Sequence, residues 1–407
     1  ACAGPGSRSG GAPAAAPTGG AATGGISFAH WRAEDKAVFD GILGTFTGAN
    51  PGVTVRQDIS PSNDYATTAL QRLRGGQVGD AFAAFPGAQF TNISSAGLFS
   101  DLSNAAYKAN YDSRYLDAGA SGGKQLALPY HVVFNMPVTN EDLLDRAGAA
   151  GVPENWADFL DLCDKLKGAG VAPIAWPGGE PGNAGQLWNS MVMNNAPSPD
   201  VGAKIESGDF SCTDDWYLKT LDQYAQLRPF FQPNATGTAV EPAQQIFAQG
   251  KAGMLATGSY HVAAVRALGA RFPLGLLSPI TVDEGDEAEY EGVFNQTFML
   301  AVNSASAKQQ AAAKLVEHLS SPQVASVYAN GTSQHLTVKD VDYTNADLKA
   351  LAPWLQRKTA RAPRVGFLDL DIRNAVENAA VRVVGGAAPE QAAEEAQRVV
   401  DQKRPKS

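Results

Sequence analysis

The sequence has few of the residues on which many catalytic and metal sites depend. Its 407 residues include only three cysteines and five histidines, and no two histidines lie four positions apart. A zinc site is therefore not expected, and we predict neither a metal nor another cofactor. The sequence also has no Walker A and no G-x-G-x-x-G motif, which excludes the usual nucleotide-binding loops.

Positive charge and long apolar runs are scarce as well. Thirty-two Lys and Arg face 41 Asp and Glu, which gives a net charge of −9 with no basic cluster. Binding to nucleic acid is not expected, because it depends on clustered basic side chains. No run reaches the roughly 18 apolar residues of a membrane-spanning helix. The composition is that of globular domains, and the length predicts two or three of them.

The first 25 residues consist mostly of Ala, Gly, Pro, Ser and Thr, so a flexible linker is expected there. Cys2 lies in this segment at a small-residue site typical of bacterial lipid attachment, and an anchor to the membrane through acyl chains is expected. Cys163 and Cys212 are too far apart for a C-x-x-C motif. In an exported protein they suggest one disulfide, with two unpaired buried thiols as the alternative.

The order of apolar patterns near the start predicts alternating strands and helices. Residues 26–30, 53–56 and 81–85 read as strands, and residues 34–46 and 63–73 read as helices between them. This order predicts an α/β fold with a largely parallel sheet, which binds ligands beyond the carboxyl ends of its strands. The pocket residues predicted by that rule are His30, Trp31, Arg32, Asp64, Phe85 and Gln89.

Two motifs have enzymatic interpretations. Gly119–Gly123 matches the G-x-S-x-G pattern of a nucleophile elbow, but polar residues precede Ser121 and a strand follows it, so catalysis there is not expected. The acidic pairs Asp214/Asp215 and Asp369/Asp371 could serve glycosidic cleavage, although surface acids are the commoner explanation.

Several aromatic residues sit in loop-like surroundings. Trp31, Trp176, Trp188 and Tyr260 neighbour Gly, Pro or small polar residues rather than apolar runs. Such rings can stack on the C–H face of a sugar while nearby amides and charged groups bind its hydroxyls. The alternative is that they are ordinary half-buried aromatics.

A series of segments in a fixed order resembles the extracellular solute-binding proteins of bacterial ABC sugar importers. The segments are GDAF at residues 79–82, GLFSDL at 97–102, GKQLALPY at 123–130, PENW at 153–156 and FAQGKAGMLATGSY at 247–260. The resemblance runs from about Ile26 to Val400. It is incomplete, because Ala84 and Val133 replace a Trp and a carboxylate of the maltose-binding members, which argues against a maltodextrin ligand.

The resemblance implies a two-lobed periplasmic-binding-protein-like fold of type II, with a hinge between the lobes. Residues 26–132 and 296–320 would form lobe 1, and residues 133–295 and 321–407 would form lobe 2. Ligand would bind in the cleft between the lobes and drive their closure. The resemblance also assigns a larger set of ligand-binding residues: His30, Trp31, Arg32, Phe85, Gln89, Trp188, Tyr260, Asn295, Gln296, Asp369 and Arg373. Asn189, the neighbour of Trp188, is predicted to bind ligand as well.

The sequence thus predicts a non-catalytic, monomeric receptor on the outer face of a bacterial membrane. It would be held there by a lipid on Cys2, bind a mono- or short oligosaccharide, and deliver it to the transmembrane permease subunits of an ABC transporter. Two alternatives are a secreted glycoside hydrolase and a binding protein for a polyol, a peptide or another non-sugar solute.

Overall fold

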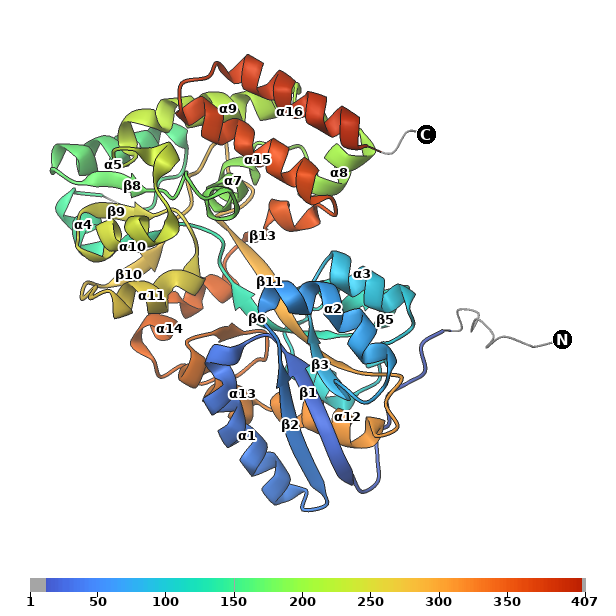
Figure 1. The fold of residues 1–407 in the computed structure, drawn as a ribbon. Coiled ribbons are helices and arrows are strands. Elements are labelled where there is room, and N and C mark those ends of the chain that lie inside the picture. The colour runs from blue at the N-terminus through green and yellow to red at the C-terminus, as the bar shows by residue number, and fades with distance from the viewer. Residues whose placement is uncertain (1–11, 150, 405–407) are drawn as a thin grey trace. The chain divides into compact units, whose positions relative to one another are not determined.

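The structure, a computed structural model, describes residues 12–149 and 151–404. They form two compact units, each built from separate segments of the chain (Figure 1). Within the described residues, unit 1 comprises residues up to 132 and residues 296–344, and unit 2 comprises residues 133–295 and those from 345 onward. Residues 321–344 were expected in the second lobe, which is wrong. They belong to unit 1 because Tyr328 is buried there and donates a hydrogen bond to Asp35 (2.5 Å).

The main sheet of unit 1 is mixed rather than largely parallel. Its strand order is β12-β6-β11-β3-β1-β2, and off this path β13, whose residues belong to unit 2, pairs with the first residues of β11, which also belong to unit 2. The pairs β1–β2 and β1–β3 are parallel, whereas β11–β3 and β12–β6 are antiparallel. The strands are β1 (Gly24–His30), β2 (Val53–Ile59), β3 (Ala81–Ala84), β6 (Leu128–Val133), β11 (Gly292–Val302), β12 (His335–Leu336) and β13 (Thr359–Arg361).

Helices cover both faces of this sheet, because alternate strand residues are apolar on both sides. Phe28, Ala83 and Leu300 pack into one core with α1 and α13, whereas Phe82 and Met299 pack into the opposite core with residues of α2 and α3. The helices of unit 1 are α1 (Lys36–Ala49), α2 (Ser62–Arg74), α3 (Ala88–Ser95), α12 (Gln309–Leu319) and α13 (Pro322–Thr332).

The G-x-S-x-G segment of unit 1 lies in a small hairpin. Strand β4 (Ala120–Ser121) pairs with β5 (Lys124–Gln125), with Gly122 and Gly123 at the turn. The Ser121 side chain is exposed, and the segment lacks the strand–turn–helix geometry of a nucleophile elbow.

Unit 2 has a four-stranded sheet of order β10-β7-β9-β8, in which only β8 and β9 are parallel. Figure 1 shows α15 and α16 lying side by side next to α9. The strands are β7 (Val138–Asn140), β8 (Ala172–Ala175), β9 (Ala252–Leu255) and β10 (Leu274–Leu276). The helices are α4 (Glu141–Arg146), α5 (Trp156–Gly168), α6 (Pro181–Ala184), α7 (Gln186–Val192), α8 (Val201–Ser207), α9 (Asp215–Leu227), α10 (Val240–Ala248), α11 (Val262–Ala267), α14 (Ala346–Leu351), α15 (Leu370–Val384) and α16 (Pro389–Lys403).

The core of unit 2 contains both cysteines of the suggested disulfide as free thiols. Cys163 on α5 and Cys212 before α9 are fully buried and unbonded. The disulfide expectation is therefore wrong, and the alternative of two buried thiols describes the structure. Each thiol packs as a small apolar group, and burial raises the pKa of Cys212 to about 12.

The described part of the expected linker is packed in places. The Ala16 amide donates to the Asp101 carbonyl, and the Asp101 amide donates to the Ala14 carbonyl. Small side chains do not prevent this, because the hydrogen bonds come from the backbone. The linker expectation is thus wrong for residues 14–16, and Cys2 lies outside the described residues. No helix within the described residues is long and apolar enough to cross a membrane.

Candidate functional site

In unit 1, two aromatic rings meet at the ends of neighbouring parallel strands. Trp31 follows β1 and Phe85 follows β3, so the parallel pairing of these strands brings the two residues together. Their rings stack with centroids 3.7 Å apart and planes 22° from parallel. Tyr65 and Phe298 pack around the Trp31 ring at centroid distances of 5.3 and 5.0 Å. The result is a half-buried aromatic pair, which we call the Trp31–Phe85 stack.

Gln89 holds the backbone beneath this stack. Its Oε1 accepts a hydrogen bond from the Phe85 amide (2.7 Å), and its Nε2 donates to the Tyr65 carbonyl (3.0 Å). Gln89 was predicted to bind ligand. In the structure its amide is occupied by the backbone, so its visible role is to position Phe85.

His30 also has a supporting position. Its side chain is fully buried among aromatic rings, its Nε2 lies 2.8 Å from Gln57 Oε1, and its Nδ1 accepts from the Arg32 amide (3.0 Å). Burial lowers the pKa of His30. The predicted contact of His30 with ligand is therefore not what the structure shows. Arg32 beside it is half-buried and forms an ion pair with Asp35.

Two amide oxygens at Asn295 and Gln296, where the chain passes from unit 2 to unit 1, lack hydrogen-bond partners among the described residues. Gln296 Nε2 donates to Asp117 Oδ1 (2.6 Å), but Gln296 Oε1 is buried without a hydrogen bond. Asn295 Oδ1 is likewise buried and unpartnered. Buried polar atoms are normally hydrogen-bonded, so these acceptors have capacity for a further donor.

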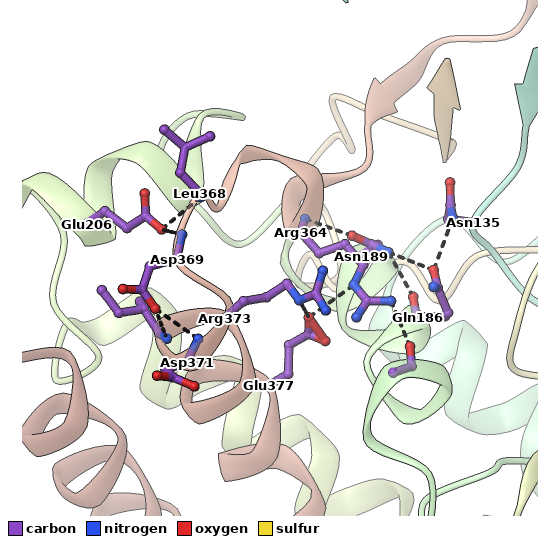
Figure 2. Close-up of polar contacts among 12 residues, drawn as sticks. Asn135, Gln186, Asn189, Glu206, Arg364, Leu368, Asp369, Asp371, Arg373 and Glu377 are labelled. Atoms are coloured by element: carbon purple, nitrogen blue, oxygen red, sulfur yellow. Dashed lines mark hydrogen bonds and ion pairs between the residues drawn. The ribbon is translucent and has the colours of Figure 1, made fainter. Parts of the chain in front are cut away.

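In unit 2, amide side chains from two segments, the loop before β7 and helix α7, form a connected row (Figure 2). Asn135 Nδ2 donates to Gln186 Oε1 (3.0 Å), and Asn189 Nδ2 lies 3.4 Å from the same oxygen. Asn189 Oδ1 accepts from the backbone amide of Arg364 (3.0 Å). Asn135 Oδ1 is buried and has no partner among the described residues. The row thus ends in a free acceptor.

Beside the amides lies a charged group made of the buried Arg364 and Glu377 and the half-buried Arg373 (Figure 2). Arg364 Nε donates to Glu377 Oε1 (3.0 Å), and Arg364 Nη1 donates to the Gly182 carbonyl (2.7 Å). Arg373 Nε lies 3.6 Å from the same carboxylate oxygen. Burial raises the pKa of Glu377 to about 7, and the two guanidinium groups oppose that shift.

Tyr260 lies in the short turn Ser259–His261 before α11. The Ser259 hydroxyl accepts from the Phe134 amide (2.9 Å), which fixes the turn, and the Tyr260 hydroxyl is buried without a partner among the described residues. Burial raises the pKa of Tyr260, against the effect of the nearby Arg364 charge. The hydroxyl is therefore a neutral group that can both donate and accept.

Four other residues that were predicted to bind ligand lie in the core, on the surface or at a helix cap. Trp176 and Trp188 are fully buried in the unit 2 core, and Trp176 stacks on Phe231, so the prediction that these rings stack on a ligand is not supported. Asp64 is exposed in the first turn of α2, and Asp369 caps α15 by accepting from the amides of Asp371 and Ile372. Loop-like sequence around a Trp did not distinguish surface from core.

Sequence reasoning missed Asn135, Gln186, Arg364 and Glu377. Glu377 could have been noticed, because it lies beside the apolar stripe of α15 (Ile372, Val376, Ala379, Ala380 and Val383), where a carboxylate needs a partner. Arg364 was indicated only weakly by the sequence, namely by its place in a loop containing Pro and Gly. The described residues contain no group of three or more His, Cys, Asp or Glu that could hold a metal ion.

With this geometry in view, comparison with known proteins identifies the family. The family model "Bacterial extracellular solute-binding protein" matches residues 31–326. The chain belongs to this family. Members of the family are binding proteins of the cell exterior, and the two-lobed α/β fold expected from the sequence is confirmed.

Sequence relatives and solved structures agree with the family. A "Probable sugar-binding periplasmic protein" of Mesorhizobium japonicum is 28% identical over 49% of this chain and 50% of that protein, so the match spans half of the relative. The "Multiple sugar-binding protein" of Streptococcus mutans is 23% identical over 78% and 76% of the two chains. Apo RafE from Streptococcus pneumoniae has a TM-score of 0.80 at 17% identity, covering 95% and 100%. RafE in complex with raffinose has a TM-score of 0.74 at 17% identity, covering 94% and 100%.

Proposed function

We propose that this protein is an extracellular receptor for a mono- or short oligosaccharide. The Trp31–Phe85 stack carries the proposal, because a half-buried aromatic face next to a charged side chain, Arg32, suits the apolar face and the hydroxyls of a pyranose ring. Unit 2 also carries polar groups suited to sugar hydroxyls, because Asn135 Oδ1 and the Tyr260 hydroxyl have no hydrogen-bond partner among the described residues. The sugar-binding names of the sequence relatives support the same class of ligand.

A sugar panel tests this proposal. The panel contains raffinose, stachyose, D-galactose and chitin oligosaccharides, with sorbitol and a tripeptide for comparison, and it is measured by thermal shift and tryptophan fluorescence. We expect at least one sugar to raise the melting temperature by several degrees and to change the fluorescence. Binding to sorbitol or the tripeptide alone would replace the sugar by another solute, and no response to the sugars would refute the proposal.

Two variants connect the response to the structure. Trp31→Ala should weaken sugar binding at least about tenfold, since residues central to a binding site commonly contribute about 2 kcal/mol or more. Tyr107→Ala is the matched control, because Tyr107 is another partly buried aromatic residue of unit 1 that packs elsewhere in the core. Equal losses in both variants would show that the aromatic stack has no special role.

The transport step and the membrane anchor are parts of the same proposal. The receptor would pass its sugar to the permease subunits of an ABC importer while a lipid on Cys2 holds it at the outer face of the membrane. Membership of an extracellular solute-binding family supports this location. Mass spectrometry of the protein from membranes of its host tests the anchor, because acylation of Cys2 adds the mass of the lipid and a Cys2→Ser variant should be released.

The enzymatic alternative finds no support in the carboxylates that suggested it. Asp214 Oδ2 accepts from the Ser211 amide (2.9 Å), and Asp369 caps α15. Asp371 forms an ion pair with Lys403. These acids have local structural roles, so binding without catalysis is the function that the geometry favours.

A further inference from the structure

Glu377 has an unusual position for a carboxylate. Only 4% of its surface is exposed, and it lies on the apolar side of α15 beside Val376 and Ala380. Its carboxylate rests directly on Gly185, where a Cβ would overlap with Oε2, so a larger residue at this position would displace the carboxylate. Gly185 immediately precedes α7, which carries Gln186 and Asn189. The carboxylate therefore connects three segments: the loop containing Arg364, α15, and the start of α7.

The contacts of Arg364 show what this connection does. Its side chain reaches Glu377 and the Gly182 carbonyl, and its backbone amide is fixed by Asn189 Oδ1. The last of these bonds connects the loop to the amide row, which ends in Asn135 Oδ1, an acceptor with no partner in the described part of the chain (Figure 2). A change at Glu377 would thus shift both the Arg364 guanidinium and the amide row.

We propose that Glu377 is a positioning residue for the sugar site: its ionised carboxylate holds Arg364 and the start of α7 in the arrangement that binds ligand, and binding therefore weakens when it takes up a proton. This inference rests on the proposed function. Under this proposal pH controls the affinity for sugar through Glu377, which supports the ligand-facing groups and does not itself contact the sugar.

The surroundings of Glu377 set where this control operates. Arg364 and Arg373 favour the ionised carboxylate, while Tyr217 and Tyr224 on α9 face it as neutral hydroxyls, since burial raises the pKa of both well above its ordinary value. The α6–α7 turn contributes the Gly185 backbone, and α16 contributes the small apolar residues of its buried face. Burial outweighs the guanidinium groups and raises the pKa of Glu377 to about 7. The carboxylate therefore changes its charge within the neutral range.

The first test needs no substitution. The dissociation constant of the tightest-binding sugar of the panel is measured by calorimetry from pH 5.5 to pH 8.5. If only the ionised form binds, the competent fraction falls roughly tenfold between pH 8 and pH 6, and the dissociation constant should rise by about that factor. Absence of any sugar binding at pH 8 would refute the proposed function. Sugar binding with an unchanged constant would refute only the role of Glu377.

Variants separate positioning from simple stabilisation. Glu377→Gln mimics the protonated side chain, so it should bind the same sugar at least tenfold more weakly at pH 8, and its remaining affinity should not change across the pH range. Arg373→Gln removes a charge that favours ionisation, and the midpoint of the affinity profile should move to higher pH. A Glu377→Gln variant that is less stable but keeps the wild-type pH profile of affinity would show a merely structural role and overturn the inference.

Discussion

The candidate binding groups of the two units are built in different ways. In unit 1 they come from the ends of adjacent parallel strands, and aromatic rings dominate them. In unit 2 they come from segments far apart in the sequence, such as Asn189 and Arg364, and buried amides and charges dominate them. The aromatic surface depends mainly on packing, whereas the polar group depends on each partner being present. The two should therefore respond differently to substitution and to pH.

The largest effect is expected for Arg364→Met in unit 2. It leaves the buried Glu377 carboxylate without its 3.0 Å partner, and removal of one member of a buried ion pair typically costs about 3–5 kcal/mol. The loss of unfolding free energy should be greater at pH 8 than at pH 6, because at pH 6 the unpaired Glu377 carboxylate takes up a proton and is no longer a buried charge. Urea unfolding at both pH values measures it.

The matched control is Arg382→Met on α15, the helix that also carries Glu377. Arg382 pairs with Glu395, but both side chains are about 40% exposed, so this variant should lose no more than about 1 kcal/mol. Equal losses in the two variants would show that burial does not distinguish the Arg364 group from a surface pair.

The second prediction concerns pH and Glu377. Its pKa is about 7 in the folded chain and about 4.3 in an unfolded one, so the folded state holds the proton more tightly. The stabilisation due to this proton is complete below about pH 4.3 and is lost as the pH rises through 7, about 4 kcal/mol in all. Between pH 5 and pH 8 the free energy of unfolding of Glu377→Gln should therefore fall less than that of the wild type. A parallel fall in both proteins would contradict the raised pKa.

The third prediction concerns the support of the aromatic stack in unit 1. Gln89→Leu leaves the Phe85 amide and the Tyr65 carbonyl without their side-chain partner, at an expected cost of about 1–3 kcal/mol. The change should appear in Trp31 fluorescence and should not depend on pH between 6 and 8, in contrast to Arg364→Met. A pH-dependent loss would mean that the two units are not as different as their contacts indicate.

Much of unit 1 could be predicted from sequence, and little of the polar group in unit 2 could. The pattern of strands and helices predicted β1, α1, β2, α2 and β3, and the rule for parallel strands then brought Trp31 and Phe85 together. Arg364 and Glu377 meet only after their loop and helix pack onto α7, and no local pattern encodes that packing. The prediction that Trp176 and Trp188 stack on a ligand is not supported for the same reason, because tertiary contacts bury these rings although their local sequence resembles a loop.

The smallest expected effect is on the alkylation of the two free thiols, which reports the opening of unit 2 but not that of unit 1. Among the described residues both thiols, Cys163 and Cys212, belong to unit 2, and both are fully buried. Alkylation of the native protein should therefore leave them unmodified over minutes and should proceed only as unit 2 opens. Arg364→Met should accelerate this labelling, whereas Gln89→Leu in unit 1 should leave it nearly unchanged, as read by mass spectrometry of the peptides containing the two thiols. If Gln89→Leu accelerated labelling as much as Arg364→Met, the two units would open together. The two units would then differ in their candidate binding groups but not in their stability.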